Sequence, residues 1–182
     1  GRLMAVDPQT FAEDPLRALR VVQFAARFGF SVHPDLAKLC KDASLFALPA
    51  ERIWGELEKL FLRAPAPSIG WQLMNDLEIT DKVLPELHET ASPSTDAILD
   101  RAAERREHLD GRGRKLILML SGWLHHCTPS VVEASLNRLN VHRLYGVAVR
   151  KRVMECTVLW HQVSGTVSDR ELKRLADETE LT

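Results

Sequence analysis

The chain has 182 residues, of which 45% are hydrophobic and 27% are charged, the balance of an ordinary globular protein. Its formal net charge of −1 argues against a strongly basic nucleic-acid binder, although a local basic face stays possible. No apolar run approaches the ~20 residues of a membrane span. Three widely spaced cysteines lack metal-ligand spacing, and we expect reduced, mostly buried thiols of a cytoplasmic protein at Cys40, Cys127 and Cys156.

The first strong pattern is an amphipathic helix over Leu16–Phe28, because apolar residues recur there with helical spacing. Asp14 is predicted as its N-cap, Pro15 as its first residue and Gly29 as its C-cap. Arg17 and Arg20 are three residues apart and so share a face. A carboxylate acceptor beside a planar guanidinium offers the groups needed to read the edge of a nucleobase. The alternative is a well-capped helix with local ion pairs.

Helices are also predicted along the rest of the chain. The first four should run from His33 to about Ala43, from Pro49 onward, from Pro67 or Ser68 to Leu77, and from Thr80 to Leu87. Ala91–Ser94 is predicted to be a loop and a domain boundary. Further helices are expected near 95–109, 114–126, 129–139, 143–162 and 168–178. The predicted class is therefore all-α, with one multi-helix domain over 1–87 and a second over 88–182.

Two motifs resemble the bacterial-type tRNA nucleotidyltransferases, the family of CCA-adding enzymes and bacterial poly(A) polymerases. The first is Glu-Asp-x-x-Arg at 13–17, with Phe11 before it, Arg20 after it and Arg-Phe-Gly-Phe at 27–30. The second is Arg-x-x-x-Glu at 52–56. The resemblance covers residues 6 to 62. It implies that 1–87 is the family's neck and 88–182 its helical body.

The resemblance implies that this chain selects a nucleotide. Asp14 would accept a hydrogen bond from the exocyclic amine of cytosine or adenine, and Arg17 would donate to the adjacent ring nitrogen or carbonyl. Glu13 would orient the arginine, and Arg20 would contact phosphate or form a structural pair. Arg52 and Glu56 would brace the base-reading helix. The spacing alone predicts that Arg52 and Glu56 form a surface i,i+4 ion pair, which would contribute a few tenths of a kcal/mol to stability.

The same resemblance implies an absent catalytic head that holds magnesium on an Asp pair. We therefore expect a C-terminal fragment, inactive alone, with no catalytic residue, metal site or cofactor of its own. The full enzyme would use CTP or ATP and magnesium to add CMP or AMP to the 3′ end of tRNA or another RNA. Separation from the head predicts self-association through the first helix. Nothing in the sequence separates CCA, CC or A addition from poly(A) synthesis.

The body carries weaker signals. Six cations are candidates for phosphate contacts to RNA or for a solvated face, namely Arg112, Arg114, Lys115, Arg150, Lys151 and Arg152. Some relatives place a His-Asp metal pair after an apolar helix, where this chain has His125-His126, with His88, Asp96 and His108 upstream. Because this chain has no carboxylate at that place, we predict that the body has a structural role and no metal site. Trp54, Trp71, Trp123 and Trp160 are predicted in the core. Two alternatives stay open, a helical RNA-binding or scaffold module and a degenerate phosphohydrolase body.

Overall fold

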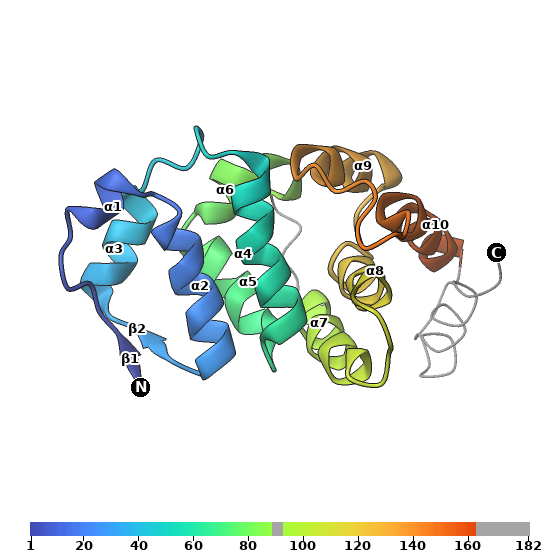
Figure 1. The fold of residues 1–182 in the computed structure, drawn as a ribbon, viewed down its shortest axis with the longest axis horizontal. Helices are drawn as coiled ribbons and strands as arrows, with labels where there is room; N and C mark the ends of the chain where they lie inside the picture. Colours follow the sequence, from blue (N-terminus) through green and yellow to red (C-terminus); the bar gives the residue numbers. More distant parts are fainter. Residues whose placement is uncertain (89–92, 163–182) are drawn as a thin grey trace.

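The structure, a computed structural model, describes residues 1–88 and 93–162. Helices dominate it, which confirms the all-α class (Figure 1). In chain order the elements are β1 (Arg2–Leu3), α1 (Thr10–Glu13), α2 (Arg17–Phe28), β2 (Ser31–Val32), α3 (Pro34–Asp42), α4 (Ala50–Arg63), α5 (Pro67–Asp76), α6 (Ile79–Val83), the 3-10 turn η1 (Pro85–Leu87), α7 (Pro93–Arg106), α8 (Arg112–Trp123), α9 (Pro129–Arg138) and α10 (Val149–Gln162).

The N-terminal segment is fastened beside the end of α2. Its two-residue strand β1 pairs in parallel with β2, with Arg2 opposite Ser31 and Leu3 opposite Val32. In sequence, α2 ends just before β2. Its C-cap is Gly29, whose φ of 63° is the left-handed conformation that glycine adopts without strain. This confirms the predicted C-cap. The segment before α1 therefore runs along α2 and forms one wall of the groove described below.

Several predicted boundaries were wrong. The helix expected from 143 begins only at Val149, because Tyr145 and Gly146 have positive φ and Leu144 bridges to Val147. The helix expected over 80–87 divides into α6 and η1, since Pro85 has no N–H to continue the ladder. Pro93 and Ser94 belong to α7 rather than to a loop. The helix predicted over 168–178 lies outside the described residues.

The hydrophobic core runs from α1 through α10. Helix α5 packs on both α2 and α7, and α4 packs on α8. At their junction Trp123 lies 5.0 Å from Phe61 and 5.3 Å from Trp71, ring centroid to centroid. Trp54, Trp71 and Trp123 are buried, as predicted, while Trp160 is half-buried and meets His125 edge-on. The division at residue 87 stays a prediction.

Helix α7 also ties the turn between α4 and α5 in place. Buried Arg106 donates to the carbonyls of Phe61 and Ala64, which end α4. Asp100 accepts hydrogen bonds from the backbone N–H and the hydroxyl of Ser68, at the start of α5. These side chains satisfy backbone groups that helix ends leave without partners. The two halves of the chain are therefore joined by polar contacts as well as by the core.

The predicted burial of the three cysteines is confirmed. Cys40, Cys127 and Cys156 are buried free thiols, and desolvation raises the pKa of Cys40 to about 12. Within 1–88 and 93–162, no helix is both long enough and apolar enough to cross a bilayer.

Candidate functional site

Asp14 occupies the bend between α1 and α2. It ends α1 with φ −136° and ψ 89°, an extended conformation that suits a residue preceding proline. Its carbonyl accepts the N–H of Arg17, and Pro15 and Leu16 form a turn before α2 begins. The carboxylate makes no cap hydrogen bond to α2, so the predicted N-cap role was wrong. The side chain is left available for contacts outside its own helix.

That contact is with the second motif. Arg52 on α4 donates through Nη2 to Asp14 Oδ1 at 3.0 Å, across 38 residues of sequence. Both side chains keep partial exposure, 48% for Arg52 and 30% for Asp14. The pair therefore lies at the surface, and the Asp14 carboxylate stays partly exposed beside its contact with Arg52. Tertiary packing of α4 has brought the two predicted motifs together.

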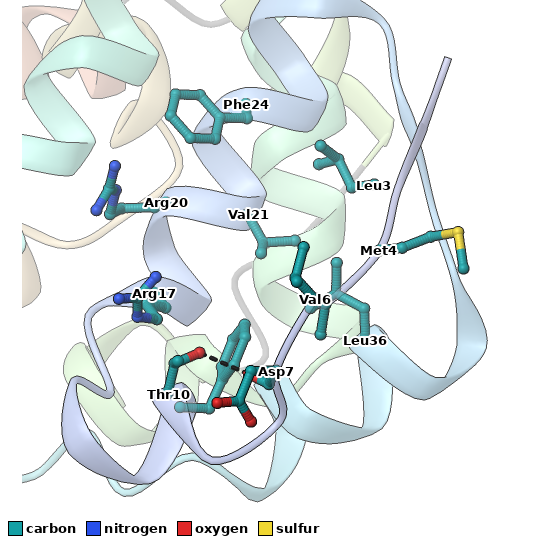
Figure 2. A pocket seen from close by; sticks show the side chains of 12 residues that line it. Leu3, Met4, Val6, Asp7, Thr10, Arg17, Arg20, Val21, Phe24 and Leu36 are labelled. Atoms are coloured by element: carbon teal, nitrogen blue, oxygen red, sulfur yellow. Dashed lines mark hydrogen bonds between the residues drawn. The ribbon is translucent and has the colours of Figure 1, made fainter.

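Arg17 and Arg20 project from the same side of α2 (Figure 2). Both line a groove of about 390 Å³ whose other wall is the N-terminal segment, including Leu3, Met4 and Val6. Arg17 Nε is buried and has no hydrogen-bond partner among the described residues. A buried guanidinium nitrogen without a partner is costly, and a ligand acceptor would remove that cost.

Glu13 and Glu56 lie differently from the residues beside them in the motifs. Glu13 ends α1 with an exposed side chain. Glu56 is buried at 6% exposure and pairs with Lys59 Nζ at 2.7 Å, in the next turn of α4. Arg52 thus pairs with Asp14, and the surface Arg52–Glu56 pair considered from the spacing is not the contact that forms.

Most predicted body cations are held by groups of this chain. Arg112 lies 3.6 Å from Glu58 and stacks over the Tyr145 ring at 4.6 Å. The other side-chain contacts join Arg150 to Asn137 at 2.5 Å, Arg152 to Glu155 at 3.0 Å and Lys151 to Glu155 at 3.8 Å. Arg114 is exposed on α8, and Lys115 beside it is half-buried. Their role toward RNA stays a prediction.

The histidines of the body are scattered over different partners. His125 is buried and hydrogen-bonds the Gly122 carbonyl at 2.7 Å, while His126 bonds the Ser94 hydroxyl at 2.7 Å. His88 contacts Asp81, and Asp96 accepts from Gln72. Within the described ranges no three His, Cys, Asp or Glu side chains gather to hold a metal ion. His108 lines a separate polar hollow on α7.

A polar contact that the sequence analysis does not predict joins α4 to the segment before α10. The Tyr145 hydroxyl donates to Glu58 at 2.6 Å, which raises the pKa of that tyrosine. Nearby, Asn140 donates to Glu51 at 3.0 Å. The pKa of Glu51 is lowered, first by its own backbone N–H and then by Asn140. No local pattern signals these pairs, because their partners are 87 and 89 residues apart.

The chain is similar to known proteins in sequence and in fold. Residues 29–90 match the family model described as "Probable RNA and SrmB- binding site of polymerase A". The CCA-adding enzyme of Bordetella bronchiseptica is 39% identical over 109 residues, or 57% of this chain and 29% of that protein. The CCA-adding enzyme of Pseudomonas putida is 34% identical over 149 residues, or 78% of this chain and 38% of that protein. The chain thus spans well under half of these relatives.

Solved structures share the fold. The Thermotoga maritima CCA-adding enzyme, solved in complex with tRNA, superposes with a TM-score of 0.63 at 20% identity, covering 100% of this chain and 51% of that one. A CCA-adding enzyme solved with CTP gives 0.64 at 19% identity, covering 96% and 46%. These matches show the shared fold. The family model and the sequence relatives show that the chain belongs to the tRNA nucleotidyltransferase and poly(A) polymerase family, as a C-terminal portion of such a protein.

Proposed function

We propose that this chain is the nucleotide-selecting and RNA-holding part of an enzyme that adds CMP or AMP to the 3′ end of tRNA or a related RNA. The observation that carries the proposal is the 3.0 Å pair between Asp14 and Arg52. It links two motifs through residues 38 apart in sequence. The Asp14 carbonyl also accepts the N–H of Arg17, whose Nε has no partner among the described residues. Relatives named as CCA-adding enzymes and a neighbour solved with CTP support it.

In this proposal Asp14 and Arg17 have complementary roles. Arg52 engages one carboxylate oxygen of Asp14, and the other can accept from an exocyclic amine of cytosine or adenine. Arg17 then donates to the neighbouring ring nitrogen or carbonyl. The edges of guanine and uracil present the wrong order of donors and acceptors for this pair. Arg52, as a brace, fixes the carboxylate so that discrimination does not depend on a mobile side chain.

Glu13 and Arg20 have supporting roles in this proposal. Glu13 helps to orient the arginines from the end of α1, and Arg20, exposed on α2, meets a phosphate of the nucleotide or the RNA. Buried Glu56 supports α4, and so Arg52, from inside through its ion pair with Lys59. The body cations add phosphate contacts farther along the RNA.

Transfer of the nucleotide itself needs groups from a catalytic head. Within the described residues no donor set fits magnesium, so the metal enters this proposal only with the head. We place the reaction in the cytoplasm, in keeping with three free cysteines. Self-association through α2 stays a further prediction: Phe28 on that helix is 52% exposed, and sedimentation at high concentration checks it.

The test uses the complete protein, with its sequence upstream of Gly1, in an assay of CMP and AMP incorporation into tRNA lacking its 3′ end. The Asp14→Ala, Arg17→Ala double variant should lose its preference for CTP and ATP over UTP and GTP. A pair of hydrogen bonds to one base edge supplies about 1–3 kcal/mol of discrimination. Asp35→Ala, which removes an exposed carboxylate on α3, is the control. Salt-dependent RNA binding without nucleotide preference in the unaltered protein would instead favour a binding module.

A further inference from the structure

The proposed nucleotide site leaves one sequence feature of α2 unexplained. Arginine and phenylalanine are interspersed along α2 and just beyond its end, at Arg20, Phe24, Arg27, Phe28 and Phe30, which we call the Arg–Phe stripe. At about 100° per residue, its four helical members fall within an arc of about 100°. The core face of α2 lies opposite and contains Ala18, Leu19, Val22, Ala25 and Ala26. The stripe is therefore not explained by core packing.

The members of the stripe contact one another in sequence. The Arg20 guanidinium lies 5.7 Å from the Phe24 ring, and Phe24 lies 5.9 Å from Phe28. The Arg27 guanidinium is 5.0 Å from the Phe28 ring, which is 5.6 Å from Phe30. Phe28 is 52% exposed, and the rings of Phe24 and Phe30 are partly exposed. The result is a continuous surface of aromatic faces with interleaved cations.

We propose that the Arg–Phe stripe binds the unpaired nucleotides that lead to the 3′ end of the RNA. Aromatic faces stack on bases of any sequence, and arginines neutralise the phosphates between them. Charge favours a polyanion over a protein surface, because α2 carries three arginines and no acidic residue in a chain whose formal net charge is −1. An exposed apolar stripe with cations at each turn suits single-stranded RNA better than an acid-containing protein face.

The dimensions suit a short stretch of RNA. The step from Arg20 to Phe28 is about 12 Å at 1.5 Å per residue. Bases stacked at about 3.4 Å would fill it with three or four nucleotides. The stripe begins one turn beyond Arg17, so a strand lying along it points toward the proposed nucleotide site. In that one respect, the direction of the strand, the inference rests on the proposed function.

Binding of a short fluorescein-labelled oligoadenylate to this chain tests the stripe, followed by anisotropy against the same strand annealed to its complement. Phe28→Leu keeps an apolar side chain of similar size but removes the ring, and should weaken binding of the single strand about ten-fold. Phe28→Trp, with a larger stacking face, should strengthen it. Phe46→Leu removes a more exposed phenylalanine, at 76%, outside the stripe, and should have no effect. The duplex should bind more weakly and be insensitive to both leucine variants.

Three results would overturn the inference. Equal affinities of Phe28→Leu and Phe46→Leu for the single strand would show that aromatic stacking is not used. Equal binding of the duplex would leave only electrostatic attraction. Loss of self-association in Phe28→Leu with RNA binding unchanged would make the stripe a protein contact. The preference of the complete protein for CTP over UTP is measured separately. If the stripe does not bind RNA, that nucleotide preference is still expected. If the nucleotide site is wrong, the effect of Phe28→Leu on RNA binding is still expected.

Discussion

The arginines of α2 and those of the body differ in their surroundings. On α2, Arg20 and Arg27 lie against phenylalanine rings, and Arg17 has a buried Nε without a partner in the described residues. In the body, cations are paired within the chain: Arg112 with Glu58, Arg138 with Glu86, and Lys151 and Arg152 with Glu155. Both regions look basic in sequence. Whether a cation is free to bind a phosphate therefore depends on the acidic side chains beside it in the folded protein, and not on the number of basic residues near it in the sequence.

The largest expected effect comes from breaking the junction that holds the two regions together. Arg106→Met keeps the apolar stem but removes the donors to the Phe61 and Ala64 carbonyls, leaving two buried acceptors without partners. The free energy of unfolding should fall by about 2–4 kcal/mol. Urea unfolding of the chain measures it, and Arg105→Met on the exposed face is the control. A change under about 0.5 kcal/mol would show that the core alone joins the regions.

A smaller but more specific effect is expected at Arg52. Because the Asp14–Arg52 pair is surface-exposed, Arg52→Gln should cost less than about 1 kcal/mol of stability. The preference of the complete protein for CTP over UTP should nevertheless drop about ten-fold, since a loosened carboxylate reads the base less well. Incorporation kinetics with each nucleotide measure this, beside Arg63→Gln at the other end of α4. If both variants keep the preference, Arg52 has only a structural role.

Removing one positive charge from α2 and one from the body tests which region contacts the phosphates of RNA. Arg27→Gln on α2 should reduce the slope of log affinity for RNA against log salt by about 1. Arg152→Gln in the body should change the slope less, because Glu155 already neutralises that cation. Anisotropy titrations at several salt concentrations compare them. The reverse order would restore the body as the main phosphate contact.

The smallest effect concerns the contact between α4 and the body. The hydrogen bond to Glu58 raises the pKa of Tyr145 above its ordinary value of 10.0, with burial and the Glu58 charge adding to it. The raised pKa means that the folded state favours the protonated phenol. This contribution to stability is present below about pH 10 and is lost as the pH rises through the folded-state pKa.

Tyrosinate absorbance measures this pKa directly, because Tyr145 is the single tyrosine of the chain. Glu58→Gln should lower it toward 10, since the charge that opposes ionisation is gone. Glu51→Gln, which alters the neighbouring contact to Asn140, is the control. An unchanged titration in Glu58→Gln would mean that the hydrogen bond does not persist in solution.

Much of the fold was readable from local sequence. Apolar spacing and the glycine at 29 predicted the end of α2 at Phe28, while its start at Arg17 lies two residues beyond the predicted first residue, Pro15. His33 with Pro34 marked the start of α3, where His33 Nδ1 accepts the N–H of Asp35. The errors fell where local signals compete. The helix expected from 143 fails because the 144–147 turn has two positive φ values, and Asp14 loses its cap role to a turn at Pro15.

The candidate site divides in the same way. Local sequence predicted most of the helices and the C-cap at Gly29, because these depend on periodicity within a few residues. The two motifs, through the family resemblance, made Asp14, Arg17 and Arg52 the candidate residues. Three features are visible only in the tertiary structure: Arg52 pairs with Asp14, Arg106 is buried against α4, and several body cations lie beside acidic residues. Except for Glu155 with Lys151 and Arg152, these partners are tens of residues apart. Their meeting depends on how helices pack, which no local pattern encodes.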